Sequence, residues 1–410
     1  MGSFGKLFFD GFPAFCKKYA IYFAPVLCLV FLIAESYQAD FRPFYVAARS
    51  VVLHLNPYLN PVNEFPELFA AGNANDSPAS GFRYPPFAAL VFAPLGLITS
   101  YEVARIVFSL LMLASFVGVF FWMARRLRFE LPSSAVVLAL VSFPTLALFE
   151  RGQIDIFLVL LALAVFLLYE QGGGVARGTA ALLLAIAAQI KIFPIFLLVY
   201  FLVRQRDWKF CLYTVLFGLG LAALAYGYFG SEVHYSFLQR SLPEVFGPIT
   251  RDQPISTHGQ SIENIYIINA IQGNGKIFAH DFVNGRMNVL FFESSIGAVV
   301  FGTVAMVVLL LVSRKRPADA QFFQVMTGLN LVNSLAWIMG LVWYLPLFFY
   351  LYGQVGNRGK AVLLIPLFLL PFINLNGYAA YAVALLYGLG KLGSANAKSS
   401  DSGLNPLSTL

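Results

Sequence analysis

Long apolar segments, separated by short turns that carry most of the charged residues, form the dominant pattern along the chain. Apolar runs of this kind are typical of helices that cross a membrane, because a helix satisfies its own backbone hydrogen bonds in lipid. The pattern therefore predicts an all-α polytopic membrane protein with about twelve transmembrane helices. The predicted spans lie roughly at 19–36, 101–124, 133–149, 154–171, 178–190, 192–203, 210–229, 294–313, 320–340, 342–354, 361–373 and 377–391.

The composition agrees with this class, since 59% of the residues are hydrophobic and 11% are charged. A soluble domain carries about 25% charged residues. The net charge of +7 would suit an acidic partner, but in a multispanning protein its usual cause is Lys and Arg gathered in cytoplasmic loops. We therefore expect membrane lipids around the protein and no nucleic-acid partner.

Basic residues gather in alternate turns, and this predicts the orientation of the chain. The apolar run after Lys18 is followed by Glu35 and Tyr37 rather than by a small-residue cleavage site, which favours an uncleaved first span with the N-terminus inside. The basic turns then face the cytoplasm. They contain Lys6, Lys17, Lys18, Arg125, Arg126, Arg128, Arg177, Arg204, Arg206, Lys209, Arg314, Lys315, Arg316, Arg358, Lys360, Lys391 and Lys398.

The apolar stretch between Arg177 and Arg204 is predicted to turn back within the membrane. A single straight helix would place Arg206 on the outer side, against the charge pattern. Pro194 lacks an amide hydrogen and disfavours helix in the residue before it, so the apex is expected at 191–194. Each arm is about 18 Å long against about 30 Å of hydrocarbon, which places Lys191 at a tip below the outer surface.

Two long outer stretches, about 37–100 and 230–293, complete the predicted organisation. The first contains PFYVAARSVVLHL, a candidate amphipathic helix, and RYPPFAALVFAPLGLIT, which we expect to lie along or dip into the interface. We expect one transmembrane domain over residues 1–393 and a disordered cytoplasmic tail at 394–410, which is rich in Ser, Asn and Gly.

Ionisable residues at the outer ends of the predicted spans are the candidates for chemistry. Such charges usually act as interface anchors, but a lysine inside an apolar segment costs about 2.5–3.5 kcal/mol on insertion, so Lys191 is expected to be paired or functional. It could bind an anion or pair with an acid such as Asp155. No His, Cys, Asp or Glu spacing suggests a metal site. The candidates are Glu35, Asp40, Arg42, Arg83, Glu150, Arg151, Asp155, Lys191 and His258.

The order of several short motifs is similar to that of a known enzyme family. They are DFRPFYVAAR after the first span, NPY at 56–58, YPPFAALVFAPL, ERGQID, an Ala-rich helix that ends in KIFP, and an outer GQSI. Over roughly residues 20–270 the chain resembles glycosyltransferase family 87, the polyprenol-phosphate-mannose-dependent mannosyltransferases of the GT-C superfamily.

The resemblance implies a GT-C-like helix bundle with a large first outer loop. It also implies an inverting glycosyltransferase that moves a sugar, with mannose the best guess, from a polyprenyl-phosphate donor to a lipid or glycan hydroxyl. The implied location is a bacterial cytoplasmic membrane, with the active site on its outer, periplasmic face and a role in the cell envelope. We expect no cofactor and no metal, because cationic side chains can serve a monophosphate donor.

Asp40 matches the catalytic acid of the superfamily and would take the proton of the acceptor hydroxyl as a general base. The other roles are expectations from the same resemblance. Lys191, Arg151 and His258 would bind the donor phosphate, whereas Gln153, Gln260, Ser261, Arg42, Arg83 and Tyr84 would bind sugar or acceptor. As an alternative, Asp40 would organise the site by fixing Arg42 or Arg83.

One position departs from the family pattern. A histidine is expected after Trp337 in a late outer segment, but the chain has Met339 there. His258 could substitute, the donor or acceptor could differ, or catalysis could be lost. Two further classes stay open, namely a transporter or flippase for a lipid-linked sugar and a non-catalytic binder of such a lipid.

Overall fold

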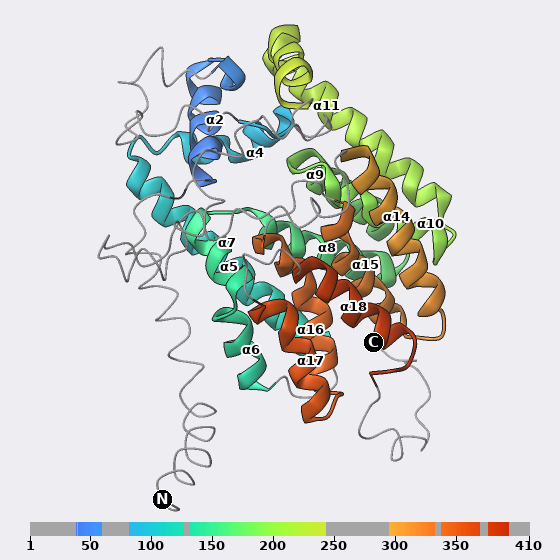
Figure 1. The fold of residues 1–410 in the computed structure, drawn as a ribbon. Helices are drawn as coiled ribbons and strands as arrows, with labels where there is room; N and C mark the ends of the chain where they lie inside the picture. The colour runs from blue at the N-terminus through green and yellow to red at the C-terminus, as the bar shows by residue number, and fades with distance from the viewer. Residues whose placement is uncertain are drawn as a thin grey trace, which may run out of the picture.

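The computed structural model describes residues 38, 40–59, 82–126, 132–242, 295–332, 338–369 and 376–392. These ranges form helices joined by turns and contain no strand, which confirms an all-α fold (Figure 1). The helices are α2 (Phe41–Leu53), η1 (Pro57–Leu59), α4 (Pro86–Gly96), α5 (Tyr101–Arg126), α6 (Ser133–Leu140), α7 (Phe143–Arg151), α8 (Asp155–Gln171), α9 (Gly174–Ile190), η4 (Phe193–Leu197), α10 (Leu198–Val203), α11 (Trp208–Ser236), η5 (Phe237–Ser241), α14 (Ser295–Val312), α15 (Ala318–Val332), η8 (Ile338–Tyr344), α16 (Leu345–Tyr352), α17 (Asn357–Phe368) and α18 (Asn376–Gly388).

The described helices include fewer full-length spans than predicted. Tyr101–Arg126 and Trp208–Gln239 are each long and apolar enough to cross a membrane. The helices Ser133–Leu140 and Phe143–Arg151 are bent by 50° relative to each other and make a third span if the two are counted as one. Other apolar helices have only 10–17 residues. Within the described ranges, twelve transmembrane helices are therefore not confirmed, and 133–149 is two helices rather than one.

The core of the bundle is the helix α15, which buries every residue from Ala320 to Val332. Although α15 carries several polar side chains, a helix that is buried on every face lies inside a bundle, where no face meets solvent or lipid. Phe322 of α15 stacks on Phe166 of α8 with ring centroids 4.5 Å apart. The neighbouring segments η8 and α16 are also almost wholly buried, so the late part of the chain is packed against α8.

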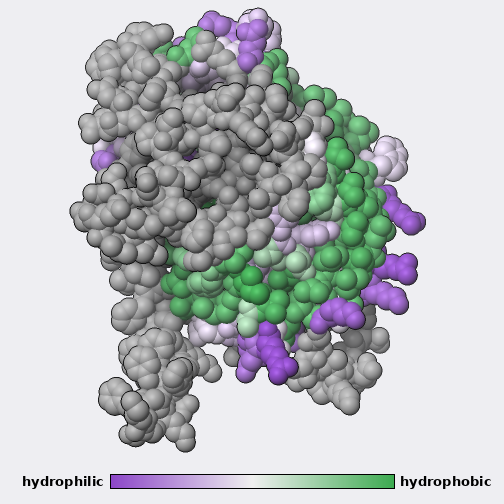
Figure 2. Space-filling view, in the orientation of Figure 1, coloured by the Kyte–Doolittle hydropathy of each residue, from purple (hydrophilic) through white to green (hydrophobic). Residues whose placement is uncertain are grey.

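The outside of the bundle is apolar where a soluble protein would be polar. On α11, Leu219 and Leu224 are 63% and 61% exposed, and Phe121 on α5 is 61% exposed. Figure 2 shows a hydrophobic surface between hydrophilic residues at the edges of the same face. An exposed apolar surface of this extent is suited to lipid, so the chain is a membrane protein.

The predicted break at Lys191 is confirmed. The helix α9 ends at Ile190, and η4 and α10 continue the chain as far as Val203. Arg177 Nη1 lies 3.6 Å from Asp207 Oδ2, although the two residues stand at opposite ends of this stretch. One straight helix would hold them about 45 Å apart at 1.5 Å per residue, so the chain turns back at Lys191.

The turns at the other end of the bundle come together through ion pairs. Arg126 at the end of α5 pairs with Glu170 near the end of α8 and with Asp319 near the start of α15. Tyr169, next to Glu170, donates a hydrogen bond to Asp207 at 3.1 Å. The turns that follow α5, α8 and α10 and the turn that precedes α15 therefore lie at one end, which agrees with the predicted grouping of basic turns.

The helices α2 and α4 occupy the opposite end and correspond to the two predicted helices of the first outer stretch (Figure 1). Their backbones approach closely at Gly96, where a Cβ atom would lie 2.2 Å from Ala48 O. Arg49 Nη1 donates to Gly96 O at 3.1 Å, and Tyr45 Oη donates to Ile98 O at 3.0 Å. This packing fixes α2, and with it the residue that precedes α2, Asp40.

The two ends of the bundle predict an accessibility experiment. Thr99 and Val175 are exposed and lie at opposite ends, because α5 starts beside Thr99 and α9 starts beside Val175. With the native cysteines replaced, Thr99→Cys should react with an impermeant thiol reagent from the outer side and Val175→Cys only from the inner side. The opposite labelling would show that the charge pattern assigns the orientation wrongly.

Candidate active site

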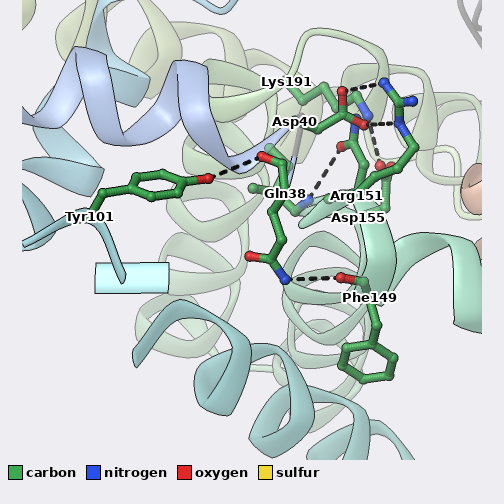
Figure 3. Close-up of polar contacts among 9 residues, drawn as sticks. Gln38, Asp40, Tyr101, Phe149, Arg151, Asp155 and Lys191 are labelled. Atoms are coloured by element: carbon green, nitrogen blue, oxygen red, sulfur yellow. Dashed lines mark hydrogen bonds and ion pairs between the residues drawn. The ribbon is translucent and has the colours of Figure 1, made fainter. Parts of the chain in front are cut away.

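An ion pair between Asp40 and Arg151 is the centre of the candidate site. Arg151 donates from Nε to Asp40 Oδ2 at 2.7 Å and from Nη2 to Asp40 Oδ1 at 2.8 Å, and Gln153 Nε2 donates to Oδ2 at 3.0 Å (Figure 3). The two-point geometry fixes the plane of the carboxylate as well as its position. Asp40 stands 111 residues before Arg151 in the chain.

The local chain explains why these side chains meet. The helix α7 ends at Arg151, and Gly152 takes the left-handed conformation with φ of 69°. A Cβ atom at Gly152 would lie 2.7 Å from Phe41 Cβ, so both the backbone angle and the close approach favour glycine. The tight turn lets Arg151 and Gln153 reach Asp40, and Asp40 N donates to Arg151 O at 2.8 Å.

Gln38 anchors the segment that precedes Asp40. Its Nε2 donates to Ser109 Oγ at 3.0 Å. The same nitrogen donates to Phe149 O at 2.9 Å, and the Gln38 backbone carbonyl accepts a long hydrogen bond from Tyr101 Oη at 3.4 Å (Figure 3). These partners belong to α5 and α7. Asp40 is therefore positioned by packing on its C-terminal side and by buried hydrogen bonds on its N-terminal side.

A second ion pair joins Lys191 to Asp155. Lys191 Nζ lies 2.7 Å from Asp155 Oδ2, and Trp343 Nε1 donates to Asp155 Oδ1 at 3.0 Å. Asp155 is the first residue of α8, where the helix dipole stabilises a negative charge. Its side chain is 2% exposed, against 18% for Lys191. Of the two roles expected for Lys191, binding an anion or pairing with an acid, the structure shows the pairing with an acid.

Tyr84 connects the two ion pairs. Burial raises the pKa of Tyr84, the negative charges of Asp40 and Asp155 raise it further, and its hydrogen bond with Gln153 and the charge of Arg83 lower it. The net effect is upward, so the phenol stays protonated at physiological pH. The positions of the charged side chains place the two ion pairs in a single site, because Arg151 and Asp155 stand on either side of the short turn between α7 and α8 and the pairs lie close together (Figure 3).

The structure brings together five of the residues predicted for the site, namely Asp40, Tyr84, Arg151, Gln153 and Lys191. Arg42 is buried on α2, and Arg83 is exposed beside Tyr84. The alternative role for Asp40 named Arg42 or Arg83 as its partner, whereas the ion pair that the structure shows is with Arg151. His258, Gln260 and Ser261 lie outside the described residues, as do Glu35 and Trp337.

Two further residues belong to the site. Asp155 was one of the ionisable candidates, with a possible pairing to Lys191 as its one stated role. Trp343 was not predicted at all, although a buried indole N–H needs an acceptor. Met339 is 2% exposed and apolar, so it supplies no polar group in place of the expected histidine. Among the described residues, no three His, Cys, Asp or Glu side chains are grouped closely enough to hold a metal ion.

A family comparison agrees with the class that fold and site define, a membrane-embedded enzyme with a charged site at one end of a helix bundle. The model of glycosyltransferase family 87 matches residues 82–337, more than half of the 410 residues. The chain therefore belongs to glycosyltransferase family 87 and is a glycosyltransferase. No curated protein matches the chain. Arg151, Gln153, Asp155 and Lys191 lie inside the matched range, whereas Asp40 lies before it.

The Lys191–Asp155 pair predicts a stability change. The insertion argument alone suggests that Lys191→Ala eases folding, but here it would leave the buried Asp155 carboxylate without its cation. We expect Lys191→Ala and Asp155→Asn each to destabilise the protein by about 2–4 kcal/mol, the low end reflecting the partial exposure of Lys191.

Thermal unfolding of the detergent-solubilised protein measures this effect. The double variant Lys191→Ala/Asp155→Asn removes both charges, so its loss of stability should be smaller than the sum of the two single-variant losses. Additive losses would contradict a direct pair.

Proposed function

We propose that the protein is an inverting glycosyltransferase that moves a sugar from a polyprenyl-phosphate donor to a hydroxyl group of a lipid or glycan. The observation that carries the proposal is the pair of fixed carboxylates, Asp40 and Asp155, each bound to a cation at one end of an apolar bundle. We propose mannose as the sugar, the outer face of a bacterial cytoplasmic membrane as the location, and a reaction without metal or cofactor.

Asp40 is the better of the two carboxylates for a general base. A carboxylate has about four acceptor positions, and Arg151 and Gln153 occupy three on Asp40, which leaves one on Oδ1. The Asp40 side chain is 18% exposed, whereas the Asp155 side chain is 2% exposed with a partner on both oxygens. Only Asp40 therefore combines a free acceptor position with access for a substrate.

The proposed step is a single displacement. The acceptor oxygen forms a bond to the anomeric carbon while the bond from that carbon to the phosphate oxygen breaks, and the hydroxyl proton passes to Asp40. Polyprenyl phosphate leaves as the anion, and attack from the opposite face inverts the anomeric centre. The charge that develops on the leaving phosphate needs fixed donors nearby.

Lys191 is the proposed donor to that phosphate. Among the described residues, the partners of its ammonium group are Asp155 in the ion pair and the ring of Phe193, 5.2 Å from Nζ. An ammonium has three N–H donors, so two are left for a ligand. Arg151 uses Nε and Nη2 for Asp40 and is proposed to contribute through its charge. His258, Gln260, Ser261, Arg42 and Arg83 remain proposed ligands of phosphate, sugar or acceptor.

The purified protein, supplied with a panel of polyprenyl-phosphate sugars and a membrane extract as acceptor, tests this function. Release of polyprenyl phosphate from one donor, with inversion at the sugar carbon, is expected. Donor movement across a vesicle without release would indicate a flippase, and binding without either would indicate a non-catalytic binder. Both results would contradict the proposal.

The role of Asp40 makes a sharper prediction in the same assay. Asp40→Asn keeps the shape of the side chain but removes the base, so turnover should fall by roughly 100-fold or more while donor binding survives. Asp319→Asn is the matched control, because it changes an acid in an ion pair at the opposite end of the bundle. Full turnover in Asp40→Asn would rule out the assignment.

A further inference from the structure

Trp343 contacts both groups that hold Lys191. Its indole Nε1 donates to Asp155 Oδ1 at 3.0 Å, and its ring meets the edge of Phe193 with centroids 5.4 Å apart. Asp155 in turn binds Lys191 at 2.7 Å, and Phe193 lies under the ammonium at 5.2 Å. The Trp343 side chain is completely buried. One rigid side chain therefore supports both contacts of the lysine at the hairpin tip.

The chemistry of indole suits this task. An indole nitrogen only donates hydrogen bonds, so it binds the charged form of a carboxylate and never competes as an acceptor for the ammonium protons. The indole binds Oδ1 and the ammonium binds Oδ2, so each oxygen of the carboxylate has a partner. The carboxylate cannot rotate without breaking one of these bonds, so the position of Lys191 Nζ is restricted as well.

We propose that Trp343 is a positioning residue for the donor phosphate, acting through Asp155 and Phe193 on Lys191. Neither Trp343 nor Asp155 is exposed enough to touch a substrate, so both act through the ammonium. The two remaining N–H groups of Lys191 are thereby held in a fixed arrangement before the phosphate arrives, which lowers the entropy cost of binding. The inference rests on the proposed function, because it takes the phosphate of a lipid-linked sugar as the ligand.

The late segment η8 thus becomes part of the donor site. Trp343 stands 188 residues after Asp155 and beyond the range that the family model matches. The other buried hydrogen-bonding aromatic residue of η8, Tyr344, donates to Leu363 O at 3.1 Å, so its partner belongs to α17 and not to either ion pair. A substitution at Trp343 therefore tests the inference, and a substitution at the adjacent Tyr344 is its control.

The test is equilibrium binding of a short-chain polyprenyl phosphate and of the corresponding polyprenol, which lacks the phosphate. Trp343→Phe keeps an aromatic ring beside Phe193 but removes the N–H donor. It should weaken binding of the phosphate about five- to tenfold, the size expected for about one typical hydrogen bond, because Trp343 acts on the phosphate only through Lys191. Binding of the polyprenol should not change, and Tyr344→Phe should change neither.

A second measurement separates positioning from general damage to the fold. In a Lys191→Ala background the ammonium is absent, so adding Trp343→Phe should produce no further loss of phosphate binding. Three outcomes would overturn this inference but not the proposed function. They are a further loss of the same size in the Lys191→Ala background, equal losses of phosphate and polyprenol binding in Trp343→Phe, and unchanged phosphate binding in Trp343→Phe. Failure of the unaltered protein to bind polyprenyl phosphate would overturn the proposed function and the inference with it.

Discussion

The two-point ion pair between Arg151 and Asp40 is the interaction on which the rest of the site depends. It joins the start of α2 to the turn between α7 and α8 through two hydrogen bonds of 2.7 and 2.8 Å. In a partly buried setting such a pair is strong only when its geometry is fixed, because both charges have lost water. Gly152, Gln38 and the close packing of α2 on α4 supply that geometry.

Broken helices are the second constraint, because they bring polar residues into an apolar bundle. The chain interrupts its helices before Asp155 and at Lys191. Such breaks are tolerated inside membrane proteins where neighbouring elements satisfy the freed backbone groups. At the end of α7, Asp40 N donates to Arg151 O and Gln38 Nε2 donates to Phe149 O. The same breaks explain why most described helices are shorter than a full span.

Sequence patterns predicted the helical elements well, because apolar runs and turn residues act locally. The extents of α5, α8 and α9 and the break at Lys191 agree with the structure, since Pro194 and the flanking charges signal them. The bend between α6 and α7 was missed although Pro144 lies beside it. A proline near the start of a helix and one inside a span give similar local signals.

Pairing between residues distant in the chain was harder to predict. Asp40, Arg151 and Lys191 were identified as site residues because charges are rare in an apolar chain. Their partners depend on how helices pack, which no local pattern encodes, so the alternative role for Asp40 named Arg42 or Arg83 where Arg151 is found. Trp343 was missed because a tryptophan in an apolar segment is usually a packing residue, and only the fold places its N–H against Asp155.

The central claim is that the two ion pairs form the site of sugar transfer, and a structure with a bound donor tests it most directly. The measurement is a cryo-electron microscopy map of the protein in a lipid nanodisc with a short-chain polyprenyl-phosphate sugar. The account predicts the donor phosphate about 3 Å from Lys191 Nζ, with the anomeric carbon on the side of Asp40. A donor bound instead at the opposite end, beside Arg126 or Arg177, would contradict the account.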